Sequence, residues 1–315
     1  MCELIKNVDS RYLEAVKLIN EHKGYDASIV ESPKCNGVQL GMMVREAGSD
    51  VAPVILLKPL SDEDTAEDIA EDILEFVKKD SEKGNQSDVY IKALSMIKSF
   101  EKARGNISFR VCMSKGNEDI LKGVVQDAFL DLTIYYVLQM SYGENTASMR
   151  ITDEHLLEWG VTQEDIRRIA KENEASMPVY SLSNMGLLGM FFGFDDSVGD
   201  VFSPSETVPG GMYKITYESG IGGASLILRN ELLKAVADNT GCDLVILPAS
   251  VDEIIVVPLP EITSSDICTF DNMVQNVNQE CFSEEPEYIL SDHVYVFGRE
   301  EERILDMLEV MQKYD

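Results

Sequence analysis

The stretch that decides the fold is Asp243-Leu244-Val245-Ile246-Leu247-Pro248-Ala249-Ser250-Val251-Asp252-Glu253-Ile254-Ile255-Val256-Val257. It contains two short apolar runs, 244–247 and 254–257, and a polar segment between them. Continuous apolar runs of this length, bounded by turn residues, are typical of buried strands. The segment 248–253 has the Pro, Ser and Asp residues of a turn, so we interpret it as the loop of a hairpin. The sequence therefore predicts two neighbouring buried strands.

Strands and helices are mixed along the rest of the chain. Further predicted strands lie at 26–32, 38–45, 54–57, 107–113, 129–138, 212–217 and 293–297, and predicted helices at 8–22, 89–103, 226–238, 266–279 and 300–312. Asn36-Gly37 predicts a hairpin turn between the first two strands. This order lacks strict βαβ alternation, so we expect an α+β fold with mixed or antiparallel sheets and packed helices. The length favours two sub-regions, 1–150 and 151–315, with a variable loop segment near 183–211.

Helix starts are the clearest local signals. Ser61-Asp62-Glu63-Asp64 has the form of a capping box, and an apolar stripe of Ile69, Ile73, Phe76 and Val77 follows it. Thr152 and Thr162 predict two tandem capped helices, and Gly160 between them predicts a left-handed C-cap. Trp159 is interpreted as a core anchor between these helices, with ligand stacking as the alternative. The apolar run 187–194 is either a buried connector or a patch for a partner.

The charge of the chain is unusual. There are 56 acidic residues against 27 basic ones, and the formal net charge is −29. Such a surface repels phosphate backbones and anionic lipids, which argues against nucleic-acid and membrane binding. A hydrated surface of a soluble bacterial-type cytoplasmic protein explains it most simply. An acidic protein that mimics DNA or docks a basic protein is the sharper interpretation.

The cysteines indicate a reducing compartment. The six are far apart and contain no C-x-x-C pair or Cys/His cluster, so we expect reduced, mostly buried thiols. The first residues lack the pattern of a signal peptide, and no apolar stretch approaches about 18 residues. We therefore expect a cytoplasmic protein with no metal site and no cofactor.

Four residues are candidates for catalysis. Ser250, Asp252 and Glu253 project at strand ends, and His293 begins a later strand. A hydrolytic serine needs a base within about 3 Å, and a divalent ion would be an alternative aid. The opposing interpretation is a polar hairpin turn and a structural histidine. Adjacent strand residues point to opposite faces, so Asp292 is a poor orienter of His293.

A glycine-rich segment, Gly220-Ile221-Gly222-Gly223, lies between a predicted strand and a predicted helix. Backbone N–H groups of Gly220, Gly222 and Gly223 would suit an anion at a helix N-terminus. The segment has neither a G-x-G-x-x-G pattern nor the Lys of a P-loop, and Glu218 would repel phosphate. A tight turn with close helix packing is the favoured interpretation.

Four blocks of the sequence resemble an uncharacterised family of domains of unknown function from gut Firmicutes. They are Phe129–Tyr136, Ile151-Thr152 with Trp159-Gly160-Val161-Thr162, Ile246–Glu253 and Leu290–Tyr295, and their order matches that family. The stretches 159–173, 223–225 and 244–248 show a weaker resemblance to the YtpQ-type family, also of unknown function. Neither resemblance implies a catalytic residue, cofactor or partner. The family often places His in the turn after Pro248, where this chain has Asp252.

The function that the sequence favours is that of a non-enzymatic interaction or regulatory protein whose acidic surface meets a basic protein. A hydrolase-like enzyme using Ser250, Asp252, Glu253 and His293 is one alternative. An acidic DNA mimic is the other. The sequence leaves the oligomeric state open.

Overall fold

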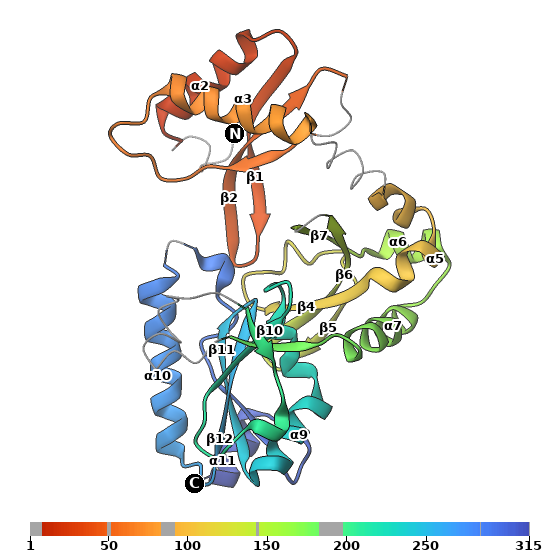
Figure 1. Cartoon of the computed structure of the whole chain (residues 1–315), viewed down its shortest axis with the longest axis vertical. Coiled ribbons are helices and arrows are strands. Elements are labelled where there is room, and N and C mark those ends of the chain that lie inside the picture. The colour runs from red at the N-terminus through yellow and green to blue at the C-terminus, as the bar shows by residue number, and fades with distance from the viewer. Residues whose placement is uncertain are drawn as a thin grey trace. The chain divides into compact units, whose positions relative to one another are not determined.

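The computed structural model describes residues 8–48, 52–82, 92–142, 145–182, 198–283 and 285–314. The chain divides into two compact units. The smaller unit comprises residues 1–103 and 140–147, and the larger one comprises residues 104–139 and 148–315. The predicted boundary near residue 150 between two sub-regions stays a prediction. The α+β class with antiparallel sheets and packed helices is confirmed (Figure 1).

The smaller unit is a three-stranded antiparallel sheet with two helices packed on one face (Figure 1). Its elements are α2 (Ser10–Glu21), β1 (Tyr25–Lys34), β2 (Gly37–Glu46), β3 (Val54–Leu56), α3 (Ala66–Glu82) and α5 (Phe100–Ala103), and residues 92–97 are also helical. Ile19 of α2, Ile73 of α3 and Met42 of β2 meet in its core. From Met42 onward the burial alternates, since Met42 and Val44 are buried while Met43 is half-buried and Arg45 is exposed, as a one-sided sheet requires.

The β1–β2 hairpin forms where the sequence places it, but its turn lies one residue earlier. Lys34 pairs with Gly37, so Cys35 and Asn36 form the two-residue loop. Asn36 takes a positive φ of 61°, which Asn tolerates better than most residues. The Asn-Gly pair was therefore a correct hairpin signal with a wrong register, because Gly37 already belongs to the strand.

Helix α3 begins one turn later than predicted. Thr65 is its cap, since the hydroxyl oxygen of Thr65 accepts the Asp68 N–H at 3.1 Å and its O–H donates to the Asp68 carboxylate. The Ser61 N–H donates to the Asp64 carboxylate at 2.6 Å, which makes a separate turn before the helix. Phe76, predicted in the buried stripe, is 53% exposed, whereas Ile69, Ile73 and Val77 are buried.

A four-stranded sheet, most of which belongs to the larger unit, is formed by β4 (Ile107–Met113), β5 (Gln126–Phe129), β6 (Leu132–Tyr142) and β7 (Asn145–Arg150). The predicted strand 129–138 is wrong at its start. A turn at Leu130 and Asp131, with a φ of 54° at Leu130, separates β5 from β6. The regular polar and apolar alternation through Asp131 concealed this turn.

Helices α6 (Asp153–Trp159) and α7 (Gln163–Ala175) start at the predicted caps, Thr152 and Thr162, and Gly160 has the predicted left-handed conformation, with a φ of 66°. The core role of Trp159 is wrong. Trp159 is only partly buried and stacks on His155, with ring centroids 5.5 Å apart.

The centre of the larger unit is a seven-stranded antiparallel sheet in the order β14-β13-β11-β12-β10-β8-β9. Its strands are β8 (Val179–Leu182), β9 (Val198–Val201), β10 (Tyr213–Tyr217), β11 (Asp243–Ser250), β12 (Glu253–Leu259), β13 (Tyr295–Gly298) and β14 (Arg303–Leu305). The helices are α9 (Asn230–Thr240), α10 (Ser264–Cys281) and α11 (Met307–Tyr314), and the short 3-10 helices are η1 (Arg104–Asn106), η2 (Pro204–Glu206), η3 (Gly223–Leu228) and η4 (Pro286–Tyr288).

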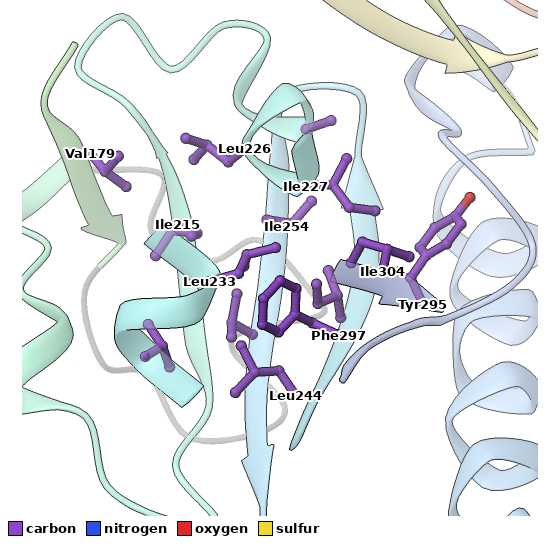
Figure 2. Packing of buried hydrophobic residues seen from close by; sticks show 14 of the residues in the cluster. Val179, Ile215, Leu226, Ile227, Leu233, Leu244, Ile254, Tyr295, Phe297 and Ile304 are labelled. Atoms are coloured by element: carbon purple, nitrogen blue, oxygen red, sulfur yellow. The ribbon is translucent and has the colours of Figure 1, made fainter. Parts of the chain in front are cut away.

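Both faces of this sheet are buried, which explains the continuous apolar runs. Leu244 and Ile246 point into a core under η3 and α9, while Val245 and Leu247 point into a second core under α10 and α11. Figure 2 shows side chains of the first core, including Leu233 of α9, converging from several elements. A sheet covered on both faces has no polar alternation, so the predicted buried strands 244–247 and 254–257 are confirmed.

Two further predictions need correction in this unit. The predicted helix 300–312 contains β14 before α11, because Glu302 adopts a φ of 53° and turns the chain. The predicted helix 226–238 is a 3-10 helix followed by α9. Of the five described cysteines, only Cys112 and Cys242 are buried, so mostly buried thiols were a wrong expectation. The run 187–194 lies outside the described residues.

Candidate functional site

Two segments singled out from the sequence meet in the structure. Ser250 pairs with Glu253 across β11 and β12, which leaves Val251 and Asp252 as the turn. An oxygen of the Asp252 carboxylate accepts the Gly222 N–H at 2.7 Å. The Thr216 hydroxyl donates to the Asp252 carbonyl oxygen at 2.7 Å. The hairpin turn 250–253 and the glycine segment 220–223 therefore form one packed junction.

The glycines of this junction are required by close packing. A Cβ atom on Gly223 would lie 2.3 Å from the backbone oxygen of Asp252. One on Gly222 would lie 2.4 Å from Nε of Arg110, and Gly222 also has a φ of 74°. The Gly222 N–H is already donated to Asp252. These contacts favour the tight-turn interpretation, while anion binding by Gly220, Gly222 and Gly223 stays a prediction.

The electrostatics of Asp252 follow from its surroundings. Burial raises the pKa of the Asp252 carboxyl above its ordinary value, because the charged form loses hydration. The Gly222 N–H and the positive charge of Arg110 oppose this rise without cancelling it.

Ser250 and Glu253 are held by structural contacts. The Ser250 side chain is buried, and its hydroxyl oxygen accepts the Asp252 N–H at 3.1 Å, as in a hydroxyl-capped turn. Glu253 forms an ion pair with the buried Lys214 at 2.7 Å. Both contacts stabilise the turn and its neighbouring strand.

His293 is not brought into contact with the other three candidates. Its side chain is exposed, and its backbone N–H donates to the Ser291 hydroxyl at 3.1 Å. Within the described ranges, the imidazole makes no hydrogen bond or ion pair to Ser250, Asp252 or Glu253. A buried Ser250 and an exposed imidazole lack the nucleophile–base contact that a hydrolase of this kind uses.

A second polar cluster joins two of the blocks quoted for the family resemblance. The carboxylate of Asp131, in the β5–β6 turn, accepts the hydroxyls of Ser291 and Tyr295, each at 2.8 Å. Burial, and then the negative charge of Asp131, raises the pKa of Tyr295. This cluster links the β5–β6 hairpin of the four-stranded sheet to β13 of the seven-stranded sheet.

A third polar cluster, which the sequence reading missed, is buried beneath α7. Arg110 of β4 donates to the Ser108 hydroxyl oxygen at 3.1 Å and to the Gln139 side-chain oxygen at 2.5 Å. The Ser108 hydroxyl in turn donates to Oε1 of Glu174. The exposed fractions of Arg110, Ser108 and Glu174 are 7%, 5% and 3%. The available signal was the placement of Ser108 and Arg110 two positions apart in an otherwise apolar strand.

A cavity of about 600 Å³ lies beside this cluster, within the larger unit. Its walls include Phe109, Tyr136 and Tyr217. The charged and polar residues that line it are Lys171, Glu172, Glu174, Ser225, Arg229, Asn230 and Glu231. Burial, and then the negative charge of Glu174, raises the pKa of Tyr217. Pockets of this volume, mostly apolar with few polar groups, are typical of small-molecule sites.

The described chain contains no group of three or more His, Cys, Asp or Glu residues arranged to hold a metal ion. None of its described helices is long and apolar enough to cross a bilayer. The five described cysteines form no disulfide.

Comparison with known proteins bears on most of the chain. Residues 2–299 match the model of a family of unknown function, DUF5688. The chain belongs to this family. The predicted membership of a family of domains of unknown function is thereby confirmed, and the links to gut Firmicutes and to the YtpQ-type family stay predictions. No curated protein and no solved structure matches the chain.

Proposed function

We propose that this member of DUF5688 is a non-enzymatic cytoplasmic protein that binds a basic protein partner through the outer face of α3. The observation that supports the proposal most directly is the charge of that face. Between residues 67 and 75, the acidic residues are Glu67, Asp68, Glu71, Asp72 and Glu75, and basic residues do not occur there. All five side chains are exposed.

The helix has a strict division between its two faces. Ala66, Ile69, Ala70, Ile73 and Val77 are buried. The acidic residues fall on the opposite side at helical spacing, so they form a continuous strip. Phe76, four residues after Asp72, is 53% exposed beside this strip. In protein interfaces, an exposed aromatic side chain of this kind packs into the partner, while the charges around it attract the partner at long range.

The partner proposed is a protein segment rich in Lys and Arg. A strip of carboxylates attracts such a segment at long range and raises its association rate. The same strip repels nucleic acid and anionic lipid. The five described cysteines form no disulfide, which suits the reducing cytoplasm that the proposal assumes.

Binding of a ten-residue Lys/Arg peptide to the full chain, measured by fluorescence anisotropy at low and moderate salt, tests the proposal. The triple variant Glu71→Gln, Asp72→Asn, Glu75→Gln should weaken binding by at least about ten-fold, because it removes three neighbouring charges. The affinity of the wild-type protein should fall as salt rises.

The matched control changes the net charge by the same amount elsewhere. Glu118→Gln, Asp119→Asn and Glu158→Gln replace three exposed acidic residues of the larger unit. This variant should change the affinity by less than about two-fold if the α3 face is the site. Equal weakening by both triples would show that net charge alone attracts the peptide and would overturn the proposal.

The same experiment separates the alternatives. If the α3 face captures DNA-binding proteins specifically, and duplex DNA displaces it, the protein is a DNA mimic and the general proposal fails. The hydrolase alternative has less support, because the His293 imidazole has no hydrogen bond to the buried Ser250 within the part of the chain that the structure describes.

A further inference from the structure

The cavity under α7 contains an unusual polar atom. Glu174 is 3% exposed, and its Oε2 atom has no hydrogen-bond partner among the described residues. A buried carboxylate oxygen without a partner is rare in folded proteins, because it has lost its hydrogen bonds to water and no protein donor replaces them. Glu174 is one of the residues that line the cavity. A buried oxygen without a partner in such a residue suggests a ligand that supplies the missing donor.

The neighbouring contacts occupy one of the two Glu174 side-chain oxygens. Arg110 donates to the Ser108 hydroxyl oxygen at 3.1 Å, which leaves the Ser108 proton free to be donated. That proton goes to Oε1 of Glu174. Oε1 therefore accepts a hydrogen bond from Ser108, which itself accepts one from the buried guanidinium of Arg110. Oε2 is the oxygen that remains for a ligand.

The walls of the cavity suit an apolar body. Phe109 and Tyr136 are in edge-to-face contact, with ring centroids 6.4 Å apart, and both line the cavity. Phe129 and Leu228 add apolar surface. Aromatic faces attract cations in addition to burying apolar groups. A ligand with an ammonium group next to an aromatic or aliphatic body would satisfy both the carboxylate and the walls.

Two polar groups of the cavity wall, those of Arg229 and Tyr217, already have partners. The Arg229 guanidinium donates to the carbonyl oxygens of Met177 and Ala175, at 2.8 and 2.9 Å, so it holds the end of α7. The Tyr217 hydroxyl lies 3.3 Å from the Ser225 hydroxyl. A side-chain hydrogen bond to Glu174 also contributes to the raised pKa of Tyr217. Even so, Oε2 of Glu174 has no partner at normal hydrogen-bond distance among the described residues.

We infer that this cavity is a binding site for a small organic amine, whose ammonium group donates to Oε2 of Glu174 while its apolar part packs against Phe109 and Tyr136. A volume of about 600 Å³ accommodates a molecule of this class. The site lies within the larger unit and is independent of the proposed peptide-binding face on α3.

Titration of the full chain with benzylamine, benzyl alcohol and benzoate tests the inference, with calorimetry and amide NMR shifts as readouts. The three probes share a ring and differ in the group that would meet Glu174. Benzylamine should bind at least about ten-fold more tightly than benzyl alcohol, because a charged donor to a carboxylate is the stronger contact. Benzoate should not bind.

The variant Glu174→Gln keeps the shape of the side chain and should weaken benzylamine binding by at least about ten-fold. Glu231→Gln, which removes an acidic group from the exposed rim of the same cavity, is the matched control and should have less than a two-fold effect. The comparison of the three probes on the wild-type protein keeps the test valid if Glu174→Gln folds poorly. Equal affinity for amine and alcohol, or no binding by any probe because water satisfies Oε2, would overturn the inference.

Discussion

The two units of this protein place their polar groups in opposite ways. In the larger unit, polar and charged residues are buried among the strands, and Lys214 and Thr216 of β10 and Ser250 of β11 are examples. Every buried polar or charged residue among those described lies in that unit. In the smaller unit, the charges stay outside, and α3 carries five exposed carboxylates over a wholly apolar inner face. The larger unit thus contains buried polar side chains, whereas the smaller unit has its charged side chains on the surface.

The difference follows from the layers. The seven-stranded sheet is covered on both faces, so polar side chains on its central strands are buried whichever face they point to. Each of them needs a hydrogen-bond or ion-pair partner there. The three-stranded sheet is covered on one face only, so alternate side chains reach water without a partner. Substitutions should therefore cost much more in the larger unit than in the smaller one.

The largest expected effect compares two phenylalanines. Phe297 of β13 is 0% exposed in the two-sided core, and Phe76 of α3 is 53% exposed. Phe297→Ala should reduce the free energy of unfolding by about 3–5 kcal/mol, since it leaves a cavity where packing is densest. Phe76→Ala should change it by no more than about 0.5 kcal/mol. Urea unfolding followed by circular dichroism measures both, and comparable losses would contradict the division between the units.

A smaller effect compares two closely packed glycines. A Cβ on Gly223 would meet the backbone oxygen of Asp252 at 2.3 Å, whereas one on Gly41 of β2 would meet a methyl group of Val54 at 2.4 Å. Val54 is 42% exposed and can rotate away, which leaves the new Cβ of Gly41 at 3.2 Å from the Ile55 backbone oxygen. The Asp252 backbone is fixed in its hairpin, so the closer contact at Gly223 cannot be relieved in this way. Gly223→Ala should therefore cost about 1–3 kcal/mol and Gly41→Ala under about 1 kcal/mol.

Thermal unfolding of the two glycine variants checks this ranking. The Gly223→Ala variant should also shift the amide NMR signals of Gly222 and Asp252, because their hydrogen bond must move. A tolerated Gly223→Ala, with those signals unchanged, would show that the junction is looser than the contacts indicate.

The sequence predicted the layers better than the junctions. Runs such as 244–247 and 254–257 reveal a doubly covered sheet because burial on both faces removes alternation. The caps at Thr152 and Thr162 were also predictable, because a cap depends on residues three apart. The missed turns at Leu130 and Glu302 have a common cause. Both residues adopt a positive φ, which is uncommon for residues of these types and cannot be predicted from them.

The site was less predictable because its contacts are long-range. Asp252 and Gly222 lie 30 positions apart, and Ser108 and Glu174 lie 66 positions apart. Local patterns singled out the first pair separately, for a turn and for a glycine segment, without indicating that they meet. The second pair was missed because Glu174 occupies an ordinary position in an acidic helix, and only the fold places it inside.

The smallest expected effect concerns a buried and an exposed carboxylate. Burial raises the pKa of Asp252 in the folded state, so the folded protein holds its proton to higher pH than the unfolded chain does. Stability is then lost as pH rises from the unfolded pKa, near 4, through the folded value. Asp252→Asn removes this loss and can still accept the Gly222 N–H. The variant should match the wild type in acid and exceed it at pH 7, by at most about 1.4 kcal/mol for each unit of the pKa difference.

Urea unfolding at several pH values between 3.5 and 7 measures the trend. Asp72→Asn, which replaces an exposed carboxylate of α3, is the control and should change the stability at pH 7 by no more than about 0.5 kcal/mol. The opposite outcome is that Asp252→Asn becomes steadily less stable than the wild type as pH rises. The charge of Asp252 would then stabilise the fold through Arg110. The larger unit would then depend on an internal ion pair, because attraction to the guanidinium would outweigh the lost hydration of the carboxylate.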